Sequence, residues 1–169
     1  LLSLLIISCA EVPVKPMAGF KLEGRDYLYE RSSWVFWGRL ALSDEDRSMS
    51  ASIKWVHKDK RDDIELSGPF GQGRTIITIT DGSIVIDDGD NKPVQYSGAV
   101  DELVSRHLGI KIPVMALKYW VIGLLEPDVK YISFDGGFLQ AGWRVRYQQM
   151  QQEGQDLLPK KMRLEQDRV

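Results

Sequence analysis

WVFWGRLAL, at residues 34–42, and SASIKWVHK, at residues 50–58, are the two segments that decide the fold class. In both, large apolar side chains recur at every second position, which is the period of a β-strand with one buried face. Shorter segments rich in β-branched residues follow at residues 64–67, 74–80, 83–87 and 94–97. Gly, Asp and Pro clusters separate these segments, so the sequence predicts an antiparallel meander of short strands.

Two helices are expected to follow the meander. The first, at residues 99–108, carries apolar residues at helical spacing and stops before Gly109, which suits a left-handed helix end. The second is expected from Pro113 to Gly123. Strands return at residues 130–134, 138–150 and 158–166. This order predicts an α+β fold with one strongly curved antiparallel sheet whose concave face is covered by the helices.

Composition narrows the possible functions. With 169 residues, 43% of them hydrophobic, the chain is long enough to bury one core. The formal charge of −2 offers no field for a phosphate backbone, so we expect no nucleic-acid partner. The single cysteine cannot form an internal disulfide, and with two histidines it is too few ligands for a Cys₄ or Cys₂His₂ zinc site.

The N-terminus carries an export signal. Residues 1–7 read LLSLLII and are followed by Ser8 and Cys9, and the segment Ile6-Ile7-Ser8-Cys9 resembles a bacterial lipoprotein box in which the cysteine is acylated. The apolar run is shorter than the about 20 residues of a membrane-spanning helix, so an acyl anchor at Cys9 is the expected membrane contact. The alternative is a secreted protein, cut by ordinary signal peptidase, that keeps a nearby cysteine. The resemblance to sorted bacterial lipoproteins implies that Ala10, standing after the cysteine in place of Asp, favours export to the outer membrane, as in enterobacterial sorting.

Three regions are therefore expected. Residues 1–8 are the remnant of a signal peptide, residues 9–31 are a lipidated N-terminus and tether that can run extended, and residues 32–169 are a single domain. The end of the tether, from Asp26 to Arg31, is expected to be helical and to pack Tyr27 and Leu28.

Motifs for catalysis are weak, so we expect no enzyme, no cofactor and no metal. His57 and His107 lie in contexts typical of solvated or packed histidines. The Gly-rich residues 68–75 lack the phosphate-loop pattern and precede a strand rather than a helix. A calcium loop beginning at Asp88 would need a carboxylate where Ala99 stands.

Phe70 is unusual because it lies in a turn made by Gly68, Pro69 and Gly71, and turn tips normally carry polar residues. Either its ring folds back into the core, or it is exposed on a protruding loop and marks a contact with lipid or a partner.

Taken together, these features resemble the LolB family of outer-membrane lipoproteins. The matching segments, in chain order, are WGRLAL at residues 37–42, Trp55, LSGPFG at 66–71, GIKIPV at 109–114, LKYWVIG at 117–123, GWRVRY at 142–147 and LPKKMRL at 158–164. The resemblance implies an incomplete β-barrel closed by helices over an apolar cavity. It implies a protein that accepts acylated lipoproteins from a periplasmic carrier similar to LolA and inserts them into the outer membrane without ATP.

The resemblance also assigns residues. Cys9 would be the lipidation site, which places the protein on the periplasmic face of the outer membrane, and Pro69, Phe70 and Gly71 would form a membrane-insertion loop whose apolar residue is usually Leu in the family. Candidates for the acyl-chain cavity are apolar residues on the strand faces expected to be buried and on the inner faces of the helices: Trp37, Ile53, Trp55, Leu66, Ile77, Ile79, Leu117, Trp120, Trp143, Val145 and Met162.

The partners implied are the carrier, cargo lipoproteins with their acyl chains, and outer-membrane lipid, and we expect a monomer. A different function remains open: an outer-membrane lipoprotein that acts as a structural or assembly module, with a filled core and no acyl ligand.

Overall fold

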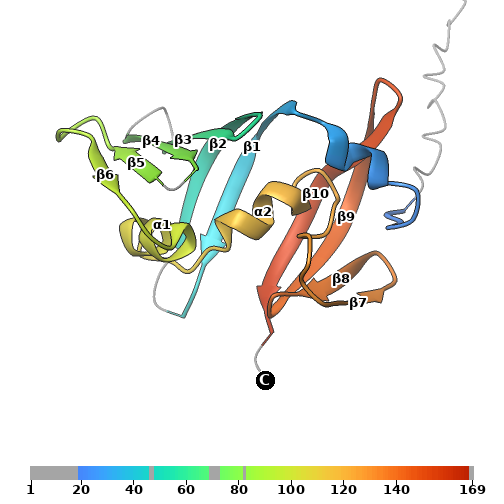
Figure 1. Cartoon of the computed structure of the whole chain (residues 1–169). Coiled ribbons are helices and arrows are strands. Elements are labelled where there is room, and N and C mark those ends of the chain that lie inside the picture. The colour runs from blue at the N-terminus through green and yellow to red at the C-terminus, as the bar shows by residue number, and fades with distance from the viewer. Residues whose placement is uncertain (1–18, 46–47, 69–72, 82, 168–169) are drawn as a thin grey trace, which may run out of the picture.

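Two antiparallel sheets and two short helices make up the structure, a computed structural model that describes residues 19–45, 48–68, 73–81 and 83–167 (Figure 1). The first sheet contains, in sequence order, β1 (Ser33–Ser43), β2 (Ser48–Lys58), β3 (Arg61–Ser67), β4 (Arg74–Thr80), β5 (Ser83–Asp87) and β6 (Val94–Tyr96). The second has the order β10 (Asp156–Gln166), β9 (Trp143–Glu153), β8 (Gly137–Gln140) and β7 (Tyr131–Phe134). The 3₁₀ helix η1 (Asp26–Glu30) precedes β1, and α1 (Val100–Leu108) and α2 (Val114–Trp120) lie between the sheets in the chain.

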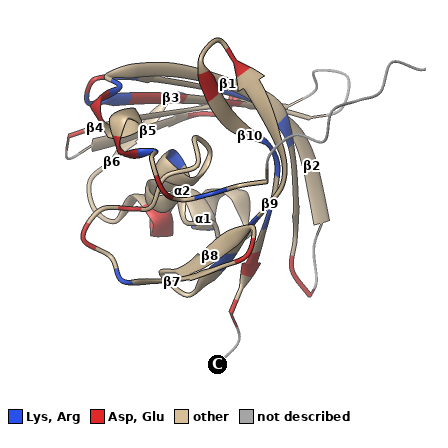
Figure 2. Ribbon diagram, turned by 90° about the vertical axis from the view of Figure 1, so that its right-hand side faces the viewer, with Lys and Arg blue, Asp and Glu red and all other residues tan. Residues whose placement is uncertain are grey.

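The expected antiparallel meander and the α+β class are confirmed. Residues of β2, β3 and β4 alternate between buried and more exposed side chains, as the period of two predicted. Trp55, Ile64 and Ile77, one from each of these strands, are all at most 4% exposed. In Figure 2 the two sheets curve around α1 and α2, and Val104 of α1 and Trp120 of α2 belong to the same apolar core as buried residues of both sheets.

The strands form two sheets instead of the single sheet expected. β1 and β10 are edge strands, and no ladder between described residues joins one sheet to the other. The predicted strand at residues 138–150 is also divided, because Ala141 and Gly142 have φ angles of 52° and 75° and turn the chain between β8 and β9. Alternation shows where strands lie, whereas their partners depend on contacts distant in sequence.

The first helix is confirmed, and it ends at Gly109 with φ 72°, in the left-handed region. α2 is shorter than expected and ends at Trp120, three residues before Gly123. The first turn of α2 has no cap from its own preceding residue, and the Asp101 carboxylate of α1 instead accepts the Met115 N–H at 2.9 Å. This bond ties the two helices together, and burial raises the pKa of Asp101.

The helical end of the tether is confirmed by η1, although Tyr27 is 48% exposed. The part before it also differs from an extended tether, because residues from Phe20 onward pack against the second sheet. Phe20 is 7% exposed, and its ring stacks on that of Tyr147 with centroids 4.0 Å apart. Leu28 in η1 is 2% exposed, and Arg31 forms an ion pair with Asp156 of β10. The folded domain thus begins before β1.

The buried Arg25 side chain fixes the chain that leaves α2. Its guanidinium donates hydrogen bonds of 2.8 Å to the carbonyl oxygens of Ile122, Gly123 and Leu157. Desolvation by burial lowers the pKa of this guanidinium from its ordinary value. Tyr147 adds a further bond, since its hydroxyl donates to the Trp120 carbonyl at 2.8 Å. These groups hold α2 against the second sheet.

We expect the Arg25→Met substitution to lower the free energy of unfolding by about 2–4 kcal/mol, because it leaves several carbonyls of the protein interior without a donor. Urea unfolding followed by circular dichroism measures this change. The control is Arg106→Met, which removes only the exposed ion pair to Glu102 on α1 and should change the stability by about 0.5 kcal/mol or less. Equal effects of both substitutions would contradict the anchoring role of Arg25.

A single apolar core joins the two sheets. It includes Ile77 and Trp55 from the first sheet and Phe138 and Val145 from the second, and Trp120 of α2 contacts Phe138 edge-on with centroids 6.3 Å apart. Within the described parts of the chain, no helix is both long enough and apolar enough to cross a bilayer.

Candidate functional site

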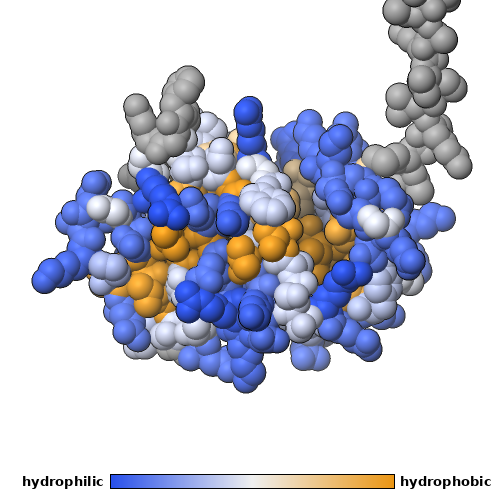
Figure 3. Space-filling model, turned by 90° about the horizontal axis from the view of Figure 1, so that it is seen from above, coloured by the Kyte–Doolittle hydropathy of each residue, from blue (hydrophilic) through white to orange (hydrophobic). Residues whose placement is uncertain are grey.

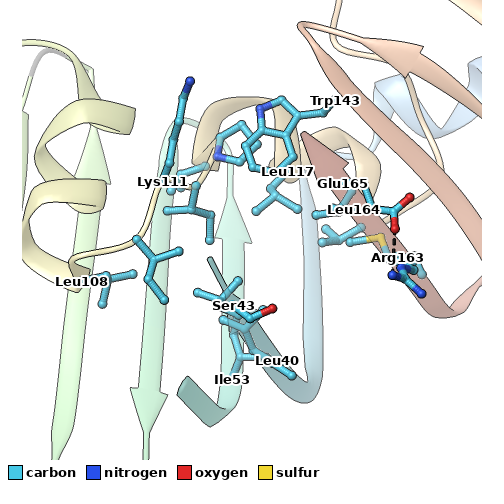
Figure 4. A pocket seen from close by; sticks show the side chains of 18 of the residues that line it. Leu40, Ser43, Ile53, Leu108, Lys111, Leu117, Trp143, Arg163, Leu164 and Glu165 are labelled. Atoms are coloured by element: carbon cyan, nitrogen blue, oxygen red, sulfur yellow. Dashed lines mark ion pairs between the residues drawn. The ribbon is translucent and has the colours of Figure 1, made fainter. Parts of the chain in front are cut away.

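A pocket of about 1210 Å³ lies between the two sheets and the helices. In Figure 4, Leu40 and Ile53 of the first sheet, Leu108 and Leu117 of the helical region and Leu164 of β10 point toward a common space. Figure 3 shows a hollowed face along which a band of apolar side chains is accessible between polar margins. These side chains form an apolar part of the pocket wall, and the pocket is open to solvent.

Most of the cavity residues predicted from the sequence line this pocket: Ile53, Trp55, Leu66, Ile77, Leu117, Trp143 and Met162. Ile79, Trp120 and Val145 do not line it and are instead packed in the core, at 6%, 0% and 0% exposure.

The placement of Trp37 in the cavity is wrong, since Trp37 is 69% exposed and lies on the outer face of β1. The inner face carries Phe36, Leu40 and Leu42, which line the pocket and which the sequence analysis missed. Both faces of β1 are rich in apolar residues, so alternation alone left the orientation ambiguous. The charged Arg39, which shares the parity of Trp37, was the signal that could have resolved it.

Gly38 on the inner face of β1 makes room for an aromatic ring. A Cβ atom at this position would stand 2.9 Å from Cζ of Phe36, so the Phe36 ring lies directly over the Gly38 backbone. A side chain at position 38 would therefore force the Phe36 ring to move.

A buried polar cluster lies behind the Trp55 side of the pocket. Trp55 Nε1 donates to Asp62 Oδ1 at 2.9 Å, and His57 Nδ1 lies 2.8 Å from the same oxygen. Lys118 of α2 pairs with Asp62 Oδ2 at 3.3 Å. The cluster orients the Trp55 ring and ties α2 to the first sheet. His57 is thus a packed histidine, as expected, although the cluster itself was not foreseen.

Charged residues surround the apolar wall. Arg39, Lys111, Lys160 and Lys161 line the pocket together with Glu165 and Asp167, and in Figure 4 Lys111 points away from the apolar side chains. Arg163 pairs with Glu165 at 2.7 Å, and Arg144 with Asp167 at 3.5 Å. An apolar interior with a charged margin suits a ligand that has a long apolar part and a polar end.

Some predicted site residues lie outside the described part of the chain: Cys9, Pro69, Phe70 and Gly71. Among the described residues, no group of three or more His, Cys, Asp or Glu side chains is arranged to hold a metal ion.

The fold and the pocket together define a class, that of α+β proteins in which sheets and helices surround an open apolar pocket. Residues 32–169 match the family model described as outer membrane lipoprotein LolB. The chain is similar to an outer-membrane lipoprotein LolB of Pseudomonas fluorescens, with 30% identity over 146 residues, covering 83% of this chain and 71% of the relative.

Two further relatives that are also described as outer-membrane lipoprotein LolB are similar to this chain. That of Thiobacillus denitrificans is 30% identical over 160 residues, covering 91% of this chain and 81% of the relative. That of Chromohalobacter salexigens is 34% identical over 122 residues, covering 68% and 56%. The chain belongs to the LolB family of outer-membrane lipoproteins, which act in lipoprotein localization and are not enzymes.

Proposed function

We propose that the protein accepts acylated lipoproteins from a periplasmic carrier similar to LolA, holds their acyl chains in the pocket and inserts them into the outer membrane. The observation that carries this proposal is the open apolar pocket of about 1210 Å³. Pockets that enclose a drug-sized ligand are about 300–1,000 Å³, so this one has room for a longer apolar ligand. In this proposal the two sheets are the walls of an incomplete barrel and the helices are its cover.

Transfer without ATP requires that each step release the cargo readily. An acyl chain gains about 0.8 kcal/mol for each CH₂ group removed from water, whether the new surroundings are a protein pocket or a bilayer. The apolar pocket wall, which includes Leu66, Ile77 and Leu117, offers such surroundings without directional bonds to the chain. A bilayer surrounds the whole length of the acyl chain, so the acyl chain is more stable in the bilayer than in the pocket.

In this proposal the protein is a monomer on the periplasmic face of the outer membrane, anchored by acyl chains on Cys9. Two or more acyl chains anchor a protein stably, whereas one is marginal. The anchor keeps the pocket near the membrane that receives the cargo.

The membrane step is assigned to the segment Pro69-Phe70-Gly71, between β3 and β4. We expect Phe70→Glu to leave cargo acceptance unchanged and to slow delivery to liposomes several-fold. Phe70 would gain about 1.5–3 kcal/mol in the acyl region, whereas a carboxylate is costly to insert there. Flotation of liposomes measures delivery, and Phe70→Leu is the control that keeps an apolar side chain. An unfolded Phe70→Glu protein would show that Phe70 belongs to the core.

The proposed function is tested by mixing a carrier loaded with a triacylated lipoprotein with this protein, produced from residue 9 onward with Cys9→Ala so that it stays in solution. We expect the lipoprotein to move to this protein without ATP, as measured by gel filtration and crosslinking. If a folded protein takes no cargo from a loaded carrier, the assembly-module function becomes the better explanation.

A further inference from the structure

The pocket opens beside two strand edges. β1 and β10 each end their own sheet, so each presents a row of backbone N–H and C=O groups that no described strand pairs. Such edges are templates for the addition of another strand, and proteins usually protect them.

The two edges differ in protection. β10 contains Pro159 and two adjacent lysines, and its pairing with β9 is irregular between Pro159 and Met162. Proline, lysine and bulges are the usual devices against strand addition. β1 has none of these: its 11 residues pair with β2 in an unbroken register, and its single charged residue is Arg39. β1 is therefore the receptive edge.

The residues that line the pocket show that it lies next to the edge of β1. Interior strands contribute alternate residues to its lining, such as Ile53 and Trp55 of β2 or Ile64 and Leu66 of β3, because only one face of each is accessible. β1 and β10 instead contribute consecutive residues, from Arg39 to Ser43 and from Pro159 to Gln166. Residues of both faces line a pocket together where the pocket meets the edge of a strand, so the edge of β1 that no described strand pairs borders the pocket.

Two exposed apolar side chains accompany this edge. Val35 and Trp37, on the outer face of β1, are 47% and 69% exposed. In a sheet, neighbours on the same face of the adjacent strand cover such side chains. β1 has the neighbour β2 on one side and no described strand on the other. Side chains of an added strand would therefore cover the surface of Val35 and Trp37 that β2 does not cover.

We propose that the free edge of β1 binds, as an added β-strand, the extended peptide that follows the acylated cysteine of the cargo. The inference rests on the proposed function, because the acyl chains must occupy the pocket for the peptide to be placed. The peptide is covalently joined to those chains, so it leaves the pocket through the mouth that β1 borders. Backbone hydrogen bonds do not depend on side chains, which suits a receptor for cargo of varied sequence.

The test compares probes for binding to the protein from residue 9 onward with Cys9→Ala. One probe is N-palmitoyl cysteine amide. The second is the same acylated cysteine followed by a soluble peptide of about eight residues, a typical strand length. We expect the peptide to raise the affinity, measured by titration calorimetry, about tenfold, since each backbone hydrogen bond adds a modest net gain.

Backbone pairing is tested with two further probes in which alternate amides of the peptide are N-methylated, one at odd and one at even positions. Only one set of amides faces β1 in an added strand. We therefore expect one methylated probe to lose the tenfold gain and the other to keep it.

Trp37→Ser tests the place of binding. We expect it to reduce the peptide gain at least threefold and to leave the affinity for palmitoyl cysteine amide unchanged, because Trp37 lies outside the pocket. The matched control is Ile132→Ser on β7, a similarly exposed side chain at 67% that should change neither affinity.

The outcomes separate the two proposals. If palmitoyl cysteine amide does not bind, the proposed function fails. If it binds but the peptide adds nothing, or both methylated probes behave alike, the strand-addition proposal is overturned. A dimer that Trp37→Ser dissociates would place a second copy on β1. Higher peptide affinity after deletion of residues 10–18 would place this chain's own segment there. Either result would also overturn the proposal.

Discussion

Replacing Ile53 by aspartate is expected to lower the affinity of the protein for a palmitoyl chain at least tenfold. Ile53 lies on β2, lines the pocket and points toward the same space as Leu40 and Leu117 (Figure 4). A carboxylate there loses hydration when an acyl chain fills the pocket, at a position where Ile53 now offers only apolar surface to the chain. A tenfold loss corresponds to about 1.4 kcal/mol, which is small against the cost of desolvating a charge.

The matched control is Ser52→Asp, the preceding residue, whose exposed side chain lies on the other face of β2. It adds the same charge to the same strand without entering the pocket, so acyl affinity should remain within twofold. Displacement of a fluorescent fatty acid measures both affinities, and thermal unfolding checks that both variants are folded. Equal acyl affinity in the two variants would show that the acyl chain does not occupy this pocket.

The largest loss of stability is expected from Gln140→Leu, which should lower the free energy of unfolding by at least about 3 kcal/mol. Gln140 is 1% exposed. Its Oε1 accepts the Trp120 indole N–H at 2.9 Å and the Glu126 N–H at 2.8 Å, and its Nε2 donates to the carbonyls of Glu126 and Val129 at 2.9 and 3.0 Å. Leucine leaves all four groups without their partner in the interior.

The control is Gln152→Leu on β9, an exposed glutamine that donates only to the Gly154 carbonyl. Its effect should stay within about 0.5 kcal/mol. If Gln140→Leu does not fold, Trp120→Phe provides a second measurement, because it removes one of the four bonds and should cost about 1–3 kcal/mol. Chemical unfolding of all variants gives the comparison. A stability loss below 1 kcal/mol in Gln140→Leu would contradict the role assigned to this amide.

Local patterns predicted the secondary structure well, and the reasons are physical. The strands from β1 to β5 follow the period of two, and the α1 helix ends at a glycine that adopts a left-handed conformation. Its buried Val104, at 1% exposure, was on the expected apolar face. The turn at Ala141 and Gly142 was missed, because the alternation continues on both sides of it and alanine seldom adopts a positive φ.

The sequence by itself determined the α+β class, the family resemblance and a part of the pocket lining, such as Ile53, Leu66 and Leu117, because apolar periodicity and ordered motifs are present along the chain. The tertiary structure alone decided that Trp37 faces outward and Phe36 inward, that the described strands divide into two sheets, and that no described strand pairs with the outer edge of β1. It also brought Arg25 and Gln140 to the backbone around α2. The physical reason is that the orientation of a strand and the partners of a buried polar group depend on residues far away in the chain, which no local pattern contains.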